Sequence, residues 1–335
     1  MSKPLRIGVL GAANIARSFT SGVRPSSRVE VAAVASRDLA KAQAFAAECG
    51  IARALGSYES LLADPAIDAI YNPLPNSLHA EWSIKALEAG KHVLCEKPLA
   101  MSADEVRAMV AAAHRTGRLL VEAYPYRAQA QTRRMQELIE AGAIGQVEII
   151  RASFGVTFAN PANIRLKPEL GGGSIYDIGS YPLSLVRLIT GTRATHVSAV
   201  ATWTETGVDR SVLASLEFPG GVLAQISSSF ATSYHRQALI AGSAGTIETT
   251  YLNHPPVGGA PVLTLRRGIL VSDPVETIPV APGNGFLLEA ESFEAAVRGG
   301  PGQWTGATQD ESLDIAMMLD AILLSMRGGG RVAVG

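Results

Sequence analysis

The first third of the chain alternates short apolar segments with segments of helical pattern, and this alternation constrains the fold most. Segment 5–11 is apolar and ends in Gly11, as a buried strand of a parallel sheet does. The predicted strands are 5–11, 29–36, 52–56, 66–74, 92–96 and 119–123, and the helices between them are 14–23, 38–49, 58–63, 77–89 and 102–116. Six strands separated by helices predict an α/β Rossmann domain with a parallel, doubly wound sheet.

The pattern changes after residue 124. One more helix is predicted at 128–141, and strand-like segments then follow one another. These segments are 147–158, 195–204, 211–218, 222–231, 236–241, 246–251, 261–267 and 275–280. They predict an α+β domain with a large, mostly antiparallel sheet, and the late helices 286–298 and 309–327 are expected to cover it. We therefore expect two domains, 1–123 and 124–335.

Composition excludes several classes of protein. The 335 residues carry 29 basic and 30 acidic side chains, a balance that gives no general attraction to nucleic acids or membrane surfaces. Two cysteines do not make a disulfide framework, and no apolar run reaches the roughly 20 residues that span a bilayer. The first strand begins too early for a signal peptide, so we expect a cytoplasmic protein. The histidines show no metal-ligand spacing, and we expect no catalytic metal.

The turn after the first predicted strand matches the dinucleotide fingerprint G-x-G-x-x-G/A, with alanine at the second glycine position. The expected cofactor-binding residues of this turn are Gly11, Ala12, Ala13, Asn14 and Ile15. Glycine permits the tight turn, and the following helix offers N–H groups and a positive dipole end to a pyrophosphate. A glycine- and alanine-rich turn without a ligand is the alternative. The place of this turn, between a first strand and a first helix, favours a dinucleotide.

The end of the second predicted strand indicates which dinucleotide binds. NAD calls for an acidic residue there, whereas this chain has Ser36 and Arg37, with Lys41 one helical turn further on. A hydroxyl, a guanidinium and an ammonium suit a 2′-phosphate. Asp38 is the contrary residue, but it stands where a helix cap is expected. We therefore expect NADP rather than NAD, with a solvated helix start as the alternative.

Four later stretches are more specific. They are 71–79 (YNPLPNSLH), 90–98 (GKHVLCEKP), 122–127 (EAYPYR) and 163–181, which includes NIRL, GGG and DIGSY. The chain resembles the Gfo/Idh/MocA family of nicotinamide-dependent sugar and polyol oxidoreductases, most closely the branch with D-xylose dehydrogenase, dimeric dihydrodiol dehydrogenase and glucose-fructose oxidoreductase. The resemblance covers nearly the whole chain and is weaker after residue 195. It implies one Rossmann domain and one antiparallel-sheet domain, in agreement with the pattern.

The resemblance also implies catalytic roles. Lys97, in the Glu-Lys-Pro motif, matches the catalytic lysine of the family, and Tyr181 matches the tyrosine of this branch. A free tyrosine has a pKa near ~10, and a neighbouring ammonium lowers it, so the pair suits alcohol oxidation. Asp177, four residues earlier, would share a helix face with Tyr181 and orient the substrate or Lys97. The alternatives are a surface lysine, a core tyrosine and a polar helix residue.

Further candidates follow from position. Leu74, Pro75, Asn76, His79, Glu96 and Lys97 lie at or just after the ends of predicted strands, where cofactors bind. His79 could instead cap the helix beside it. Arg165 precedes three glycines in an irregular stretch that could close over the cofactor. Tyr126 and Arg127 lie at the expected domain junction, and with Arg165 and Asp177 they are the expected substrate-binding residues.

These observations predict an NADP-dependent oxidoreductase that moves a hydride between nicotinamide C4 and a carbinol carbon of a sugar or cyclic polyol, as an aldose dehydrogenase does. One alternative is hydride exchange between two sugars with permanently bound NADP. An alternative of another class is a non-catalytic, NADP-sensing regulatory protein. The family's habit and the apolar residues on both faces of the later strands favour a homodimer, or a dimer of dimers, joined through the second sheet.

Overall fold

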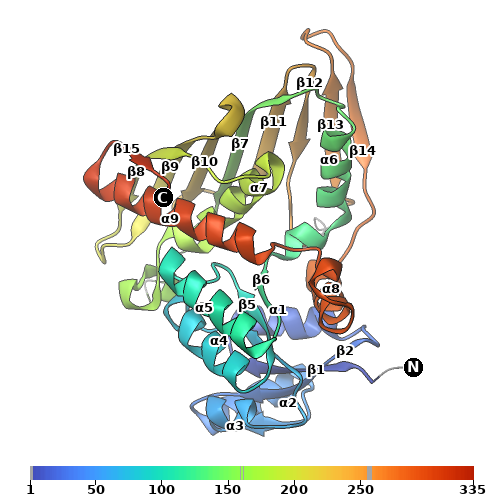
Figure 1. Cartoon of the computed structure of the whole chain (residues 1–335), viewed down its shortest axis with the longest axis vertical. Helices are drawn as coiled ribbons and strands as arrows, with labels where there is room; N and C mark the ends of the chain where they lie inside the picture. Colours follow the sequence, from blue (N-terminus) through green and yellow to red (C-terminus); the bar gives the residue numbers. More distant parts are fainter. Residues whose placement is uncertain (1–2, 159, 161, 255–258) are drawn as a thin grey trace. The chain divides into compact units, whose positions relative to one another are not determined.

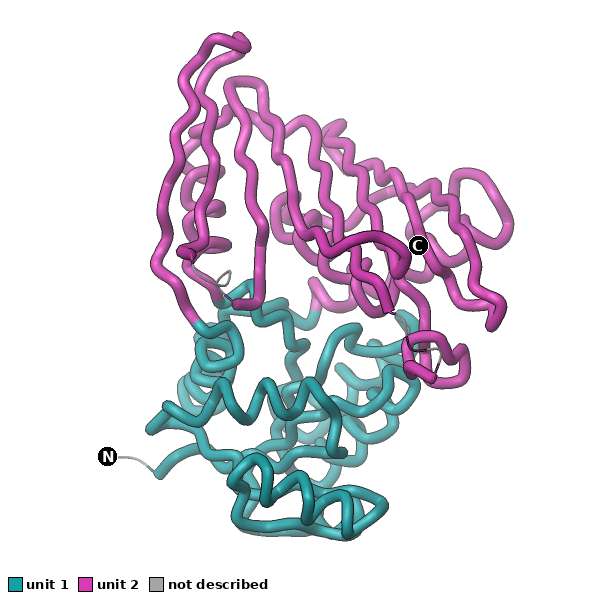
Figure 2. Tube along the Cα trace, turned by 180° about the vertical axis from the view of Figure 1, so that it is seen from behind, with its two compact units in different colours: residues 1–128, 284–309 teal, residues 129–283, 310–335 magenta. Residues whose placement is uncertain are grey.

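A computed structural model describes residues 3–158, 160, 162–254 and 259–335. The chain forms two compact units. Unit 1 comprises residues 1–128 and 284–309, and unit 2 comprises residues 129–283 and 310–335 (Figure 2). The chain thus passes from unit 1 to unit 2 after residue 128, returns to unit 1 at residue 284 and enters unit 2 again after residue 309.

Unit 1 is built on a six-stranded parallel sheet with the strand order β3-β2-β1-β4-β5-β6 (Figure 1). Its strands are β1 (Leu5–Leu10), β2 (Val29–Ala35), β3 (Ala54–Leu55), β4 (Ala69–Asn72), β5 (His92–Glu96) and β6 (Leu120–Ala123). The helices between them are α1 (Asn14–Val23), α2 (Leu39–Cys49), α3 (Tyr58–Leu62), α4 (His79–Glu88) and α5 (Ala103–Thr116). The predicted Rossmann fold is confirmed. The order reverses between β1 and β4, so the crevice above these two strands is the place where such sheets bind ligands.

Local sequence signals explain the helix ends in unit 1. The Asp38 side chain accepts hydrogen bonds from the backbone N–H groups of Ala40 and Lys41, and α2 ends at Gly50 in the left-handed region. Ser102 caps α5 in the same way through the N–H of Glu105. The cap role expected of Asp38 is therefore confirmed, and its carboxylate is occupied by the helix start.

Helix α8 (Gly285–Gly299) corrects one expectation. We expected it over the second sheet, but it packs in unit 1. Its Phe286 ring meets Phe19 of α1 edge-on at 6.2 Å, and a Cβ at Gly22 would lie 2.9 Å from the Phe286 Cβ. Arg28 also pairs with Glu294 of α8. The sequence pattern shows that the helix has an apolar face, but not which surface that face covers.

Unit 2 contains a nine-stranded sheet with the order β14-β13-β12-β11-β7-β10-β9-β8-β15. The strands are β7 (Val147–Gly155), β8 (His196–Trp203), β9 (Asp209–Glu217), β10 (Leu223–Ser229), β11 (His235–Gly242), β12 (Gly245–Thr249), β13 (Val262–Arg267), β14 (Val275–Pro279) and β15 (Arg331–Ala333). All pairs are antiparallel except β7–β10. This confirms the predicted mostly antiparallel sheet. Strand β15 was not predicted, because three residues are too short to show a period.

Three helices of unit 2 lie against one face of this sheet: α6 (Ala130–Glu140), α7 (Ser180–Thr190) and α9 (Gln309–Gly328) (Figure 1). The backbone N–H of Ala199 in β8 bonds the Ser325 hydroxyl of α9 at 2.8 Å. The opposite face of the sheet carries exposed side chains. Within the described part of the chain, the helices are too short or too polar to cross a membrane.

Candidate active site

The loops after β1 and β4 meet at the carboxyl-end edge of the unit 1 sheet. Gly11 has a φ of +82°, and a Cβ there would lie 3.1 Å from a methyl carbon of Leu74. Glycine is therefore needed both for the turn and for the close approach of the two loops. Ala13 precedes α1 without a side-chain cap, and the first turn of α1 holds no acidic residue. Small side chains and an uncapped helix start fit the pyrophosphate of a dinucleotide.

A basic side chain stands beside this edge at the end of β2. Arg37 is exposed and lies near the Tyr58 hydroxyl; burial raises the pKa of Tyr58, and the charge of Arg37 opposes that shift. The Tyr58 oxygen would lie 3.7 Å from a Cβ at Gly11. Ser36 accepts a hydrogen bond from the Asp38 N–H at 3.3 Å, and Lys41 approaches the Asp38 carboxylate at 3.8 Å. Ser36, Arg37 and Lys41 thus gather where a ribose phosphate is expected.

His79 joins two loops of this edge. Its Nδ1 lies 2.8 Å from the carbonyl oxygen of Pro98, its Nε2 lies 2.8 Å from that of Leu74, and the side chain is fully buried. Burial lowers the pKa of His79 to about 4, and the hydrogen bonds to the Pro98 and Leu74 carbonyls oppose that shift. Asn72, which sequence reasoning missed, accepts from the Leu74 N–H and donates to Ser83. These contacts give His79 the geometry of a positioning residue, while Pro75 and Asn76 beside it are partly exposed.

Two buried carboxylates hold the backbone on either side of Lys97. Glu96 accepts a hydrogen bond from the Tyr71 hydroxyl at 2.6 Å and another from the Lys97 N–H at 3.3 Å. Glu122 accepts from the N–H of Leu99 at 2.9 Å. The Lys97–Pro98 peptide bond is cis, and the Lys97 side chain is half-buried. The loop is therefore fixed through its backbone. Tyr126 and Arg127 follow β6 and are buried.

In unit 2, the segment before α7 is a π-helix (Ile175–Gly179) and not the regular helix that a shared face of Asp177 and Tyr181 requires. The carboxylate of Asp209 on β9 holds its start, because it accepts from the Ser174 hydroxyl at 2.8 Å and from the Ile175 N–H at 2.7 Å. A Cβ at Gly173, whose φ is +122°, would lie 2.2 Å from this carboxylate. π-turns are frequent at functional sites. The shared helix face expected of Asp177 and Tyr181 is therefore corrected.

Two of the predicted residues pair directly in unit 2. Arg165 Nε donates to Asp177 Oδ2 at 2.5 Å, and the guanidinium lies 4.9 Å from the centre of the Phe158 ring. The Asp177 side chain is only 13% exposed. The pair holds the carboxylate in one place, which suits a group that orients a substrate hydroxyl.

Tyr181 lies in a cluster that sequence reasoning missed. Its hydroxyl accepts a hydrogen bond from Asn253 Nδ2 at 3.1 Å, and Phe154 meets its ring edge-on at 5.7 Å. The guanidinium of Arg236 lies 4.2 Å from the ring centre. The only sequence signal for Arg236 is its charge at a position of β11 that points inward, in step with the buried Ala238 and Ile240. Asn253 lies in an irregular segment and gave no signal.

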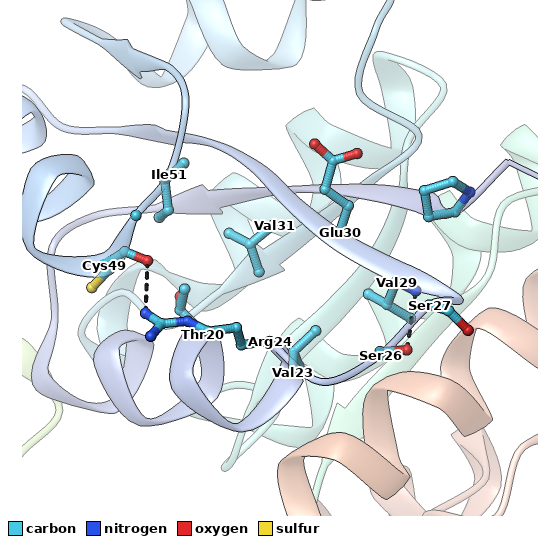
Figure 3. Close-up of a pocket in the computed structure, with 12 residues that line it drawn as sticks. Thr20, Val23, Arg24, Ser26, Ser27, Val29, Glu30, Val31, Cys49 and Ile51 are labelled. Carbon is cyan, nitrogen blue, oxygen red and sulfur yellow. Dashed lines mark hydrogen bonds between the residues drawn. The ribbon is translucent and has the colours of Figure 1, made fainter.

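A cavity of about 380 Å³ in unit 1 lies away from this edge (Figure 3). It is lined by the end of α1, the start of β2 and the end of α2, and Arg24 donates to the Cys49 carbonyl within it at 3.1 Å. The start of β2 lies at the amino-end edge of the parallel sheet, whereas the candidate active site lies at the carboxyl-end edge. None of the predicted site residues lines this cavity, so it is distinct from the candidate active site.

Comparison with known proteins matches both units. Residues 5–124 match the model of the oxidoreductase family with an NAD-binding Rossmann fold, and residues 132–248 match that of the GFO/IDH/MocA C-terminal domain. D-xylose 1-dehydrogenase (NADP(+)) 2 of Haloferax volcanii is 36% identical over 98% of this chain and 99% of that protein. Trans-1,2-dihydrobenzene-1,2-diol dehydrogenase of Danio rerio is 34% identical over 94% of this chain and 95% of that protein.

A solved structure is similar over the same length. KijD10, a 3-ketoreductase from Actinomadura kijaniata in complex with NADP and TDP-benzene, superposes with a TM-score of 0.87 at 32% identity. The match covers 97% of this chain and 98% of that one. The chain belongs to the GFO/IDH/MocA family of oxidoreductases. The family resemblance drawn from the sequence motifs is confirmed.

Proposed function

We propose that the protein is an NADP-dependent oxidoreductase that interconverts a carbinol and a carbonyl group of a sugar or cyclic polyol. The observation that carries the cofactor assignment is the basic end of β2 beside the Gly11 turn, where Arg37 lies near the Tyr58 hydroxyl and Asp38 is occupied as a cap. The first turn of α1 would hold the pyrophosphate, and Ser36, Arg37 and Lys41 the 2′-phosphate. The names of the Haloferax and Actinomadura relatives support NADP.

Bound nicotinamide supplies the hydride acceptor or donor, and the chain supplies the proton chemistry. In the oxidative direction the Tyr181 oxygen takes the proton of the substrate hydroxyl, and in the reductive direction it returns one. The Lys97 ammonium favours the phenolate form of Tyr181 and donates to the substrate oxygen. Asp177, held by Arg165, accepts from a neighbouring substrate hydroxyl. Adjacent hydroxyl groups of this kind are what sugars and cyclic diols provide.

Arg37→Ala is expected to weaken NADP binding by about tenfold or more and to leave NAD binding nearly unchanged. A charge-assisted hydrogen bond to a phosphate contributes about 1.5–3 kcal/mol, and NAD has no phosphate at this position. Calorimetric titration of both nucleotides measures the effect. Arg107→Ala on α5, which removes another exposed arginine of the same unit, is the matched control. Equal losses for both nucleotides would contradict the assignment.

Turnover on a panel of aldoses, cyclic diols and the corresponding ketones tests the reaction itself. The purified protein is expected to show no reduced-nicotinamide absorbance before cofactor is added, and to reduce added NADP with at least one alcohol of the panel. Absorbance already present would favour hydride exchange between two sugars on bound NADP. NADP binding without turnover on any member of the panel would favour a regulatory protein instead.

We also propose that unit 2 joins a second copy of the chain through the open face of its sheet. Ile149, Val200, Leu213, Leu223 and Val262 are exposed on that face, which carries a groove of about 530 Å³. Single exposed apolar residues are common, but four of these five occupy the adjacent strands β7, β10, β9 and β8. An uncovered antiparallel face of this composition supports a homodimer.

Leu213→Glu is expected to convert the dimer largely to monomer, because it would place a carboxylate in the apolar centre of the interface. Light scattering during gel filtration gives the mass, and the association constant should fall by about tenfold or more. Val271→Glu is the control, since Val271 is 95% exposed and lies in the loop after β13, not on this face. A monomeric wild-type protein, or an unchanged dimer in Leu213→Glu, would contradict the proposal.

A further inference from the structure

Arg236 of β11 carries a buried charge against an aromatic surface. Only 6% of the residue is exposed. The central carbon of its guanidinium lies 4.2 Å from the ring centre of Tyr181, 4.6 Å from that of Tyr251 and 5.0 Å from that of Phe154. We call these three rings the aromatic cluster. A cation within about 6 Å of a ring face is attracted to it, and the attraction grows when water is excluded.

A hydrogen-bond chain links the same guanidinium to the Tyr181 hydroxyl. Both terminal nitrogens of Arg236 lie 3.3 Å from Asn253 Oδ1, and Asn253 Nδ2 donates to the Tyr181 oxygen at 3.1 Å. Gln129 fixes the backbone of Asn253, because its Nε2 donates to the Asn253 carbonyl at 2.6 Å. Arg236 therefore acts on Tyr181 in two ways, across the ring face and through the Asn253 amide.

The backbone at the aromatic cluster is held in a costly conformation. Tyr251 has a φ of +36°, and it is the only non-glycine residue with a positive φ in the described ranges. Its side chain is buried, and its hydroxyl donates to the Ser153 carbonyl at 2.8 Å. Residues held in such regions are energetically costly and concentrate at functional sites. The surrounding structure thus maintains the cluster against a local penalty.

Other ionisable groups face Tyr181 from the elements packed around it. Burial and the charge of Arg236 lower the pKa of His254, which favours the uncharged ring. Asp177 of the π-helix pairs with Arg165, and Arg187 of α7 pairs with Asp314. Asp209 bonds Ser174 at the start of the π-helix, and Arg151 of β7 lines the groove on the opposite face. Arg236 is thus the cation seated on the Tyr181 ring.

We propose that Arg236 and Asn253 are positioning residues for Tyr181: the guanidinium stabilises the phenolate form, and the amide fixes the phenolic oxygen in its orientation. This inference rests on the proposed role of Tyr181 as the acid/base. A cation beside an acidic group favours its charged form. Unit 2 thereby prepares its own tyrosine for proton transfer, in addition to the help proposed for Lys97.

The pH dependence of kcat/KM for alcohol oxidation tests the inference. In Arg236→Gln the loss of the cation favours the phenol, so the limb along which activity rises should move to higher pH by about one unit. Arg236→Lys should keep the limb near the wild-type position, and Asn253→Ala should lower kcat with a smaller shift. Arg331→Gln is the matched control, because it removes an exposed arginine of unit 2 that pairs with Glu217. Its limb should not move.

An ultraviolet titration of phenolate gives a readout that does not depend on turnover. The difference between wild type and Tyr181→Phe isolates the Tyr181 transition, which should move to higher pH in the Arg236→Gln background. Circular dichroism checks that each variant is folded. If Arg236→Gln does not fold, Asn253→Ala, which cuts the hydrogen-bond chain between Arg236 and Tyr181, takes its place. An unmoved limb and an unmoved transition in a folded variant would overturn the inference. Wild-type turnover in Tyr181→Phe would instead overturn the proposed function.

Discussion

Replacing Lys97 with alanine should lower kcat by about a hundredfold or more while NADP binding changes little. The expected loss is on the scale of acid–base assistance, because the ammonium would no longer favour the phenolate or hold the substrate oxygen. The loop should survive the change. Glu96 and Glu122 hold its backbone through the N–H groups of Lys97 and Leu99, and neither bond involves the lysine side chain.

Steady-state kinetics and calorimetric NADP titration on the same preparation separate the two effects. Lys85→Ala is the matched control, because Lys85 is an exposed lysine of α4 paired with Glu81. It should leave both kcat and the NADP dissociation constant at wild-type values. A Lys97→Ala variant with wild-type turnover would remove Lys97 from the mechanism. A variant that lost NADP binding as well would make it a cofactor ligand.

The turn after β1 and the start of α2 in unit 1 were predictable because their signals are local in sequence. Gly11 closes a strand and begins a turn, and Asp38 caps the next helix, so residues within a few positions determine both. The orientation of His79 was not predictable in this way. Its partners are the carbonyls of Leu74 and Pro98, and Pro98 lies 19 residues away. A strand-end position predicts that a residue is near a ligand edge, but not whether its side chain faces the ligand.

The site in unit 2 depends on contacts that are distant in sequence. Asp209 lies 35 residues after Ser174, yet its carboxylate bonds the Ser174 hydroxyl at the start of the π-helix. Asn253 lies 72 residues after Tyr181. Motif matching identified Tyr181 and Asp177, while the register of β11 brings Arg236 onto the tyrosine ring. The packing site of helix α8 was predicted wrongly for the same reason, because Phe286 of α8 contacts Phe19 of α1, which is distant in sequence.

The second prediction with a large expected effect concerns the Tyr181 hydroxyl. Tyr181→Phe should lower kcat by about two to four orders of magnitude, because it removes the group that exchanges the substrate proton. The fold should be nearly unaffected. The phenyl ring fills the same space, keeps its contact with the Arg236 guanidinium and loses one hydrogen bond from Asn253, worth about 1 kcal/mol.

Thermal unfolding measured beside kcat distinguishes chemistry from structure. A melting temperature within a few degrees of wild type, together with the lost turnover, assigns the loss to the hydroxyl. The pH-dependent limb of any residual activity should also disappear, because the titrating group is gone. Tyr124→Phe in unit 1 is the matched control, since it removes a hydroxyl from another buried tyrosine. If Tyr181→Phe turned over at the wild-type rate, Tyr181 would be a packing residue of the aromatic cluster, and the proton would have to reach the substrate from another group.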